Sequence, residues 1–349
     1  MAKRIAVVVS QGQSNHPAKR ALEEDIVTAL LIEPGIDVTI IPNLYDLKPD
    51  GTGILALQGI SGDMIVLSWF FPRAAHWTLD RNDIRGLTGE TLLESEDDED
   101  WDEETESDEK DRVIDHRELP KRKIYCLDLR GDHGAAAFID EIKRIASEAN
   151  KQVVQLMDWI DGSPKPEQTE RFLNPTNDTS SGNGNGQPSS EATRIEETDG
   201  RRWYPVIDYS RCTNCMECID FCLFGVYGVD KIDTILVEQP DNCRKGCPAC
   251  SRVCPENAII FPQHKTPAIA GAPGVAESLK IDLSKLFGAP DEGKSAADVA
   301  VLERDEQLLI AGRDAVGATV GIAKRQTGKL DEPKDELDDL IDELDDLDL

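Results

Sequence analysis

Eight of the nine cysteines lie in two short runs, and this clustering limits what the chain can fold into more than any other feature. The first run has the spacing C-x2-C-x2-C-x3-C, and the second has C-x3-C-x2-C-x3-C-P. In chain order the eight residues are Cys212, Cys215, Cys218, Cys222, Cys243, Cys247, Cys250 and Cys254. Disulfides are rare in reducing compartments, where thiols this close in sequence are typical of metal ligands. We therefore expect metal-bound thiolates and a cytoplasmic location.

A cubane iron–sulfur cluster explains this spacing. Its four irons stand at the corners of a tetrahedron, and each needs one thiolate. Three cysteines two residues apart, on a loop that winds round the cube, reach three corners, and the fourth corner must be capped from elsewhere. Zinc prefers separate sites of four ligands, with Cys or His pairs divided by longer loops. Zinc and structural disulfides are the alternatives to this interpretation.

The two runs resemble those of bacterial-type two-cluster ferredoxins and of the dicluster modules of larger oxidoreductases, over about residues 201–262. The resemblance implies an α+β module with two short hairpins, two short helices and two [4Fe–4S] clusters. It also implies that the fourth cysteine of each run serves the other cluster. One cluster would then be bound by Cys212, Cys215, Cys218 and Cys254, and the other by Cys243, Cys247, Cys250 and Cys222.

Two positions depart from the family pattern. The second run has one extra residue between its first two cysteines, and Leu223 follows Cys222 where the family usually has proline. Neither departure removes a ligand. The wider loop carries Arg244 and Lys245, and positive charge near a cluster would favour its reduced, more negative form.

Upstream of the cysteines, short β-branched runs alternate with stretches of helical periodicity. We expect strands at residues 5–9, 36–41, 64–67 and 123–129, and helices at 17–31 and 135–150. This alternation predicts an α/β domain over residues 1–161, with a parallel sheet of the flavodoxin-like or Rossmann-like kind. Cys126 lies in the last of these strands and is expected to be a small buried core residue.

Loops that follow parallel strands gather at one edge of the sheet, where ligands bind. We expect such loops at 10–16, 68–76 and 130–134, and they contain His16, Arg73, His76, Arg130, Asp132 and His133. The first loop leads into a helix start, where backbone N–H groups are able to cradle a phosphate. A small-ligand or anion site, with a flavin as the candidate cofactor, stands beside the alternative that these are ordinary polar loops. The nearby aromatic group fits either flavin stacking or packing, and comprises Trp69, Phe70, Phe71 and Trp77.

The formal charge of −30 is concentrated in two runs. Residues 94–111 contain 13 acidic side chains and one lysine, and residues 331–349 contain 11 acidic side chains and one lysine. We interpret 94–111 as a disordered, solvated insertion in the α/β domain. The tail has an apolar stripe at helical spacing, formed by Leu337, Leu340, Ile341, Leu344 and Leu347. Such an acidic amphipathic helix suits docking into a basic, apolar groove of a redox partner, and a weakly ordered tail is the alternative.

The remaining residues divide into a flexible linker at 162–200, rich in Gly, Ser, Asn and Pro, and a partly helical extension at 263–330. The acidity argues against a nucleic-acid partner, because binding a phosphate backbone needs a basic surface. No run of about 18 apolar residues exists, so we expect no membrane-spanning segment.

Together these features predict an iron–sulfur electron-transfer protein or redox subunit, rather than a stand-alone enzyme. Two alternatives stay open. In one, the chain is an iron–sulfur oxidoreductase whose α/β domain binds a flavin or a small substrate. In the other, it is a scaffold protein whose clusters are structural.

Overall fold

The computed structural model describes residues 4–93, 110–149, 192–197, 200–273, 296–318 and 320–321. The acidic residues 94–109, most of the expected linker and the tail at 331–349 lie outside the described residues. The chain divides into two units, the first comprising residues 1–102 and 118–201, and the second residues 103–117 and 202–349. No described helix is long and apolar enough to cross a membrane.

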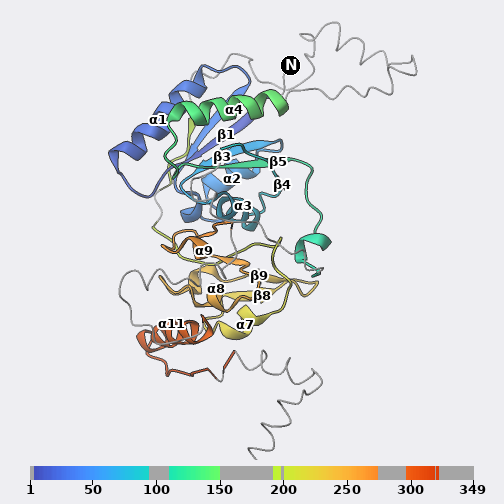
Figure 1. Cartoon of the computed structure of the whole chain (residues 1–349), viewed down its shortest axis with the longest axis vertical. Coiled ribbons are helices and arrows are strands. Elements are labelled where there is room, and N and C mark those ends of the chain that lie inside the picture. Colours follow the sequence, from blue (N-terminus) through green and yellow to red (C-terminus); the bar gives the residue numbers. More distant parts are fainter. Residues whose placement is uncertain are drawn as a thin grey trace, which may run out of the picture. The chain divides into compact units, whose positions relative to one another are not determined.

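The first unit is built on a six-stranded sheet in which every described pairing is parallel (Figure 1). Its strands are β1 (Ile5–Ser10), β2 (Ile36–Ile41), β3 (Met64–Ser68), β4 (Leu87–Thr88), β5 (Lys123–Asp128) and β6 (Thr193–Arg194). They lie in the order β4-β5-β3-β1-β2-β6. The predicted α/β class is therefore confirmed for this unit. The four long strands, and the helices α1 (Pro17–Leu31) and α4 (Ala135–Ala149), begin at the predicted residues.

Both faces of the sheet are covered, as its continuous apolar strands require. Helices α1 and α4 lie on one face, where Val7, Val9, Ile26, Phe138 and Ile142 belong to one buried core. Helices α2 (Thr52–Gln58) and α3 (Pro72–Arg81) lie on the other face (Figure 1).

Two segments of the first unit differ from the predicted organisation. The loop expected at 68–76 ends early, because Pro72 begins α3, and the fixed φ of proline suits the first turn of a helix. Residues 193–194, predicted as part of the flexible linker, form the edge strand β6 beside β2. They carry no apolar pattern, since a two-residue edge strand needs only backbone hydrogen bonds to pair.

The second unit contains two small antiparallel sheets and several short helices. Strand β7 (Val206–Ile207) pairs with β10 (Ile259–Ile260), and β8 (Tyr227–Val229) pairs with β9 (Ile235–Val237). Helices α7 (Glu217–Phe221) and α8 (Ala249–Val253) each span five residues. The short helix α9 (Pro267–Ala270) and the longer α11 (Ala296–Ile310) follow, and α11 packs against α8. Within the extension expected at 263–330 to be partly helical, the described helices are α9 and α11.

Residues 112–117 were expected in the α/β domain, but they belong to the second unit. The N–H of Val113 donates to the carbonyl of Cys212 at 2.9 Å, and Nη1 of Arg112 donates to the carbonyl of Ser210 at 3.0 Å. The Arg117 guanidinium lies 4.2 Å from the centroid of the Tyr209 ring. Backbone and cation–π contacts of this kind leave no hydrophobic periodicity in the sequence. The segment was therefore assigned to the α/β domain only because it lies between that domain's strands in the sequence.

Candidate metal centre

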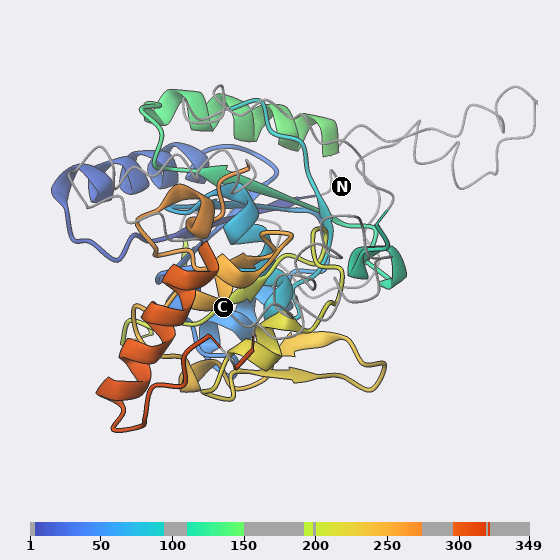
Figure 2. The ribbon, with the colours of Figure 1, turned by 60° about the horizontal axis from the view of Figure 1, so that its bottom comes forward.

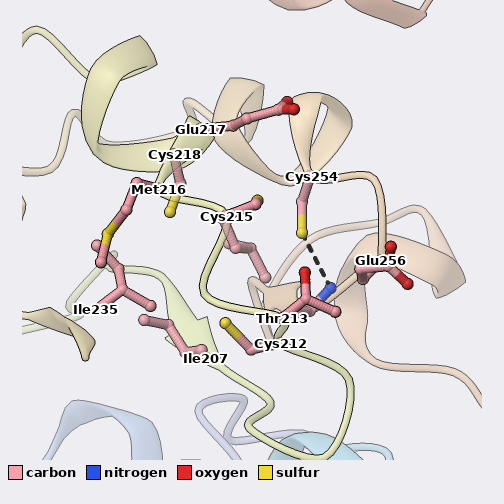
Figure 3. A pocket seen from close by; sticks show the side chains of 12 residues that line it. Ile207, Cys212, Thr213, Cys215, Met216, Glu217, Cys218, Ile235, Cys254 and Glu256 are labelled. Atoms are coloured by element: carbon pink, nitrogen blue, oxygen red, sulfur yellow. Dashed lines mark hydrogen bonds between the residues drawn. The ribbon is translucent and has the colours of Figure 1, made fainter. Parts of the chain in front are cut away.

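The structure gathers the eight clustered cysteines around two cavities. The first cavity has a volume of about 380 Å³, open mouth included, and is lined by Cys212, Cys215, Cys218 and Cys254. Figure 3 shows the sulfur atoms of Cys212, Cys218 and Cys254 turned toward a common space, with Cys215 between them. Three of these thiols come from the first run, and the fourth comes from the end of the second run.

The second cavity has a volume of about 330 Å³ and is lined by Cys222, Cys243, Cys247 and Cys250. Here three thiols come from the second run and one from the first. The two cavities group the eight cysteines in the same two sets of four as the ferredoxin resemblance implies.

Two short helices explain this exchange of cysteines. Cys222 follows Cys218 by one turn across α7, and its N–H donates to the Cys218 carbonyl at 3.0 Å. Cys254 follows Cys250 by one turn across α8, with the matching hydrogen bond at 3.2 Å. Residues four apart stand about 6 Å apart along a helix. Each helix therefore supplies one thiol to each of two neighbouring cavities.

The loop that enters the first cavity has an unusual backbone. Asn214 and Met216 have φ values of 58° and 62°, a left-handed conformation that few residues other than glycine adopt. Alternation of right- and left-handed residues turns successive N–H groups to one side, as at many iron–sulfur sites. The Asn214 side chain holds this loop in place, because it accepts from the N–H of Ile235 at 2.9 Å and donates to the Asp233 carbonyl at 2.8 Å.

Hydrogen-bond donors face the sulfur atoms in both cavities. The N–H of Ala258 donates to Sγ of Cys254 at 3.3 Å (Figure 3). In the second cavity the buried Tyr227 hydroxyl donates to Sγ of Cys250 at 3.1 Å. Donors of this kind stabilise negative charge on sulfur, which is what a thiolate ligand of a metal requires.

Burial holds the free thiols in their neutral form. It raises the pKa of Cys212 and of Cys247 to about 11 in each case, because a buried thiolate loses its hydration, and backbone N–H groups offset only part of this effect. Burial raises the pKa of Cys218, Cys243 and Cys250 still further. Thiolates here need neighbouring metal cations, and metal binding therefore releases protons.

The residues present fit an iron–sulfur cluster in each cavity. Among the described residues, no three His, Cys, Asp or Glu side chains converge on one point as a single-ion site requires. Four thiols instead surround each cavity, and a cubane offers a separate iron to each of them.

The two cavities differ in charge and in exposure. The charged residues that line the first are Glu217 and Glu256, whereas those that line the second are Arg244 and Arg304. Cys215 of the first cavity is exposed, whereas Cys250 of the second is buried. The first cavity is thus the more acidic one and contains the exposed cysteine, and the second is the more basic one and contains the buried cysteine.

Sequence reasoning missed two residues at the second cavity. Nothing in the sequence marks Tyr227, which follows the first cysteine run and begins strand β8. Arg304 did leave a signal, because it occupies the same face of α11 as the buried Ala300, Val301 and Leu308. A charged side chain at a position where the helical spacing predicts an apolar one indicates a buried charge with a specific role.

The predicted ligand loops of the first unit are held by contacts within the chain. Strands β2 and β3 flank β1, so the loops after β1 and β3 meet at the switch point of the sheet. There the Glu23 carboxylate, 3% exposed, accepts from the N–H of Gly12 at 2.8 Å and from the indole N–H of Trp69 at 2.8 Å. It also pairs with Arg20 at 2.7 Å. A carboxylate of the chain itself therefore takes the role predicted for a phosphate.

The other residues predicted for this site do not converge. Arg130 pairs with Asp128 and stacks 3.5 Å from the Phe71 ring centroid. His133 packs edge-on against Phe138, while Arg73 and His76 lie in α3. His16 and Asp132 are exposed, and Phe70, Phe71 and Trp77 are buried, as the packing alternative expects. These contacts give no support to a flavin site. Cys126 is buried, as predicted.

Comparison with known proteins finds a partial likeness. Over 66 residues the chain is 52% identical to an uncharacterized ferredoxin of Methanocaldococcus jannaschii. The match covers 19% of this chain and 44% of that relative, so the chain spans less than half the relative's length. No family model matches the chain, and no solved structure matches it. A segment of the chain, about a fifth of it, is therefore ferredoxin-like.

Proposed function

We propose that the chain is an iron–sulfur electron-transfer protein or redox subunit with one [4Fe–4S] cluster in each cavity. The observation that carries this proposal is the exchange of the fourth cysteine, Cys254 and Cys222, between the two cavities. The likeness to a ferredoxin supports the same interpretation.

The clusters supply the one-electron chemistry, and the chain supplies their ligands and surroundings. Eight thiolates bind the irons, and the donors Ala258 N–H and Tyr227 O–H offset the negative charge on sulfur. Trp203 closes the shell near the second cavity, since it stacks on Phe261 at 5.2 Å and donates to the Cys247 carbonyl at 3.2 Å. No proton transfer is needed, so the function requires no acid or base.

The partner we propose is a redox protein with a basic docking surface. The two acidic runs at 94–111 and 331–349 carry most of the negative charge and would attract it. The described end of the first run lies at the first cavity, where Lys110 pairs with Glu256 at 3.1 Å. The partner would thus be drawn toward the first cavity, and the apolar stripe predicted for the tail would serve for docking.

A stoichiometric reductive titration tests this function. Under anaerobic conditions, dithionite should bleach the visible iron–sulfur absorption with two electrons per chain, and reoxidation should restore it. Cys254→Ser should lose part of this capacity, whereas the matched change Cys126→Ser, outside both cavities, should retain all of it. Metal-loaded protein that takes up no electrons reversibly would make the clusters structural and refute the electron-transfer role.

A further inference from the structure

Arg304 is a buried cation at the wall of the second cavity. Its side chain is 1% exposed, and it lines this cavity together with the four thiols. It lies on α11, outside the segment with cysteine motifs. Burying a charge is costly unless a partner compensates for it, so the position of this guanidinium calls for a reason.

The contacts of Arg304 keep its charge only partly neutralised. Nη1 donates to the Val320 carbonyl at 2.8 Å, and Nη2 donates to the Gly317 carbonyl at 2.7 Å. The guanidinium also lies 4.5 Å from the centroid of the Phe221 ring. Carbonyls and a ring stabilise a cation without removing its charge. Two carboxylates lie nearby and neither lines the cavity: Asp305 pairs with Nε at 3.2 Å, and Glu303, whose charge also acts on Cys247, pairs with Arg252 at 3.0 Å.

The chain turns back after α11 (Figure 2), and the returning segment contacts residues beside the second cavity. Nη1 of Arg313 donates to the carbonyl of Leu223, the residue after the ligand Cys222, at 2.8 Å. Gly321 has a φ of 82°, and a Cβ there would stand 2.7 Å from Cα of Phe221. Backbone therefore packs against backbone at the end of α7. Arg304 lines the cavity and is buried beside this segment, so water screens its charge little.

A nearby positive charge stabilises the form of a cluster that has gained an electron. The reduction potential of an iron–sulfur cluster depends on net charge, on hydrogen bonds to sulfur and on solvent exposure. Arg304 and Arg244 favour reduction in the second cavity, while Glu217 and Glu256 disfavour it in the first. The exposure of Cys215 to solvent favours reduction in the first cavity and so opposes this difference. The buried charge of Arg304, however, acts through a lower dielectric than that of solvent.

We propose that Arg304 gives the second cavity the higher reduction potential of the two and so fixes the direction of electron movement in this chain. One electron leaves the first site and the second site gains it, with no bond made and no proton transferred. Arg304 is thus a tuning residue supplied by α11. This inference rests on the proposed function, because it requires a redox-active cluster in each cavity.

Four variants of the full chain test the role of this charge, with EPR-monitored redox titration as the readout. Arg304→Gln should lower the reduction potential of one cluster by about 59 mV, which corresponds to a tenfold change in the equilibrium constant of a one-electron couple. Arg304→Lys keeps the charge and should stay nearer to the wild type. Asp305→Asn removes the countercharge without truncating the buried arginine, and should shift the same potential upward. Arg4→Gln removes an exposed charge paired with Asp37 in the first unit and should change neither potential.

The affected signal is assigned to the second cavity by comparison with Cys243→Ser. The role of the charge would be overturned if Arg304→Gln had the same reduction potentials as the wild type. It would also be overturned if Arg304→Lys shifted the potential as far as Arg304→Gln does. Should Arg304→Gln fail to load iron, the opposite shift expected of Asp305→Asn still decides the question. Iron and sulfide content is measured on every variant. A wild type without two clusters refutes the proposed function, whereas two clusters with unshifted potentials refute this inference alone.

Discussion

At the scale of single residues, the cysteines depend on their neighbours as much as on their spacing. Burial raises the pKa of Cys212 and Cys247 to about 11, so the free thiols hold their protons at neutral pH. The N–H and O–H donors around the sulfur atoms supply only part of the missing stabilisation. In the proposed function, metal charge supplies the rest, and the binding of a cluster would release protons.

The hydroxyl of Tyr227 offers a direct test of a donor to sulfur. Tyr227→Phe removes its hydrogen bond to Cys250 Sγ, and should lower the potential of the second cluster. A differential loss of about 1 kcal/mol corresponds to about 40 mV for one electron. Tyr209→Phe is the matched control, because that hydroxyl donates to the Ile235 carbonyl at 3.0 Å instead. Equal shifts in both variants in a redox titration would disprove the role of the Tyr227–Cys250 hydrogen bond.

Cys126 should be inert although it is the thiol left over from both cavities. Burial raises its pKa to about 12, so little thiolate exists at pH 8 to react. In cluster-loaded native protein we expect no thiol to react rapidly with a thiol-modifying dye, and all nine to react after unfolding and cluster release. A single fast-reacting thiol in the native protein, absent from Cys126→Ser, would contradict this expectation.

The sequence predicted eight cysteine ligands, and the structure brings these cysteines together around two cavities, but the sequence did not predict the residues that surround them. Cysteines at fixed spacing are recognisable as candidate ligands, because the geometry of a cluster determines where its thiolates must lie. Tyr227 and Arg304 act through a fold that brings distant segments together, and the residue types alone do not reveal it. The loop of Gly12 shows the converse error. Its position after a strand suggested a phosphate, yet the Glu23 carboxylate eleven residues later satisfies its N–H.

At the scale of elements, the five-residue helices α7 and α8 are the parts that join the two sites. Each carries one of the clustered cysteines within it and another at its C-terminal end, one turn further on. The long elements of the first unit were predictable, since β1, β2 and β3 are apolar, β-branched runs and α1 has helical periodicity. Elements without a hydrophobic pattern, such as β6 and residues 112–117, were not predictable from the sequence, because backbone hydrogen bonds hold them in place.

The helix α4 carries a partly buried ion pair between Arg144 and Glu141, which should make the first unit sensitive to acid. A hydrogen bond from Arg144 lowers the pKa of Glu141, as does the N–H of Leu92, against the opposing effect of burial. Since the folded pKa lies below the unfolded value of 4.5, this stabilisation is present above about pH 4.5. It is lost as the pH falls through the folded pKa.

We therefore expect Glu141→Gln to reduce the free energy of unfolding by about 1–2 kcal/mol at pH 6.5, with a smaller difference from wild type below pH 4. Urea unfolding followed by circular dichroism measures this difference. Glu148→Gln is the control, because Glu148 also pairs with Arg144 but is half exposed, and should cost less than about 0.5 kcal/mol. A difference between Glu141→Gln and wild type that does not change with pH would contradict the assigned ion pair.

At the scale of the whole molecule, charge is distributed unevenly along the chain. The two acidic runs hold 24 of the 68 acidic side chains (13 and 11), whereas residues 201–262 are nearly neutral. The field that attracts a partner would therefore come from segments outside the cysteine motifs.

Removal of residues 331–349 should slow electron transfer to a basic protein acceptor and leave transfer to a small neutral dye unchanged. We expect the rate with cytochrome c, a basic acceptor, to fall several-fold on deletion and to fall with rising salt in the full chain. Stopped-flow mixing of the reduced protein with each acceptor measures both rates. An unchanged, salt-independent rate with the basic acceptor would rule out a steering role for the tail.

The most direct test of the central claim is the iron and acid-labile sulfide content of anaerobically purified protein, measured together with EPR after reduction by dithionite. Two [4Fe–4S] clusters require about eight irons and eight sulfides per chain, and two reduced clusters in adjacent cavities should give interacting S = ½ signals. Zinc in place of iron, or iron without a reducible signal, would contradict an electron-transfer function for this chain.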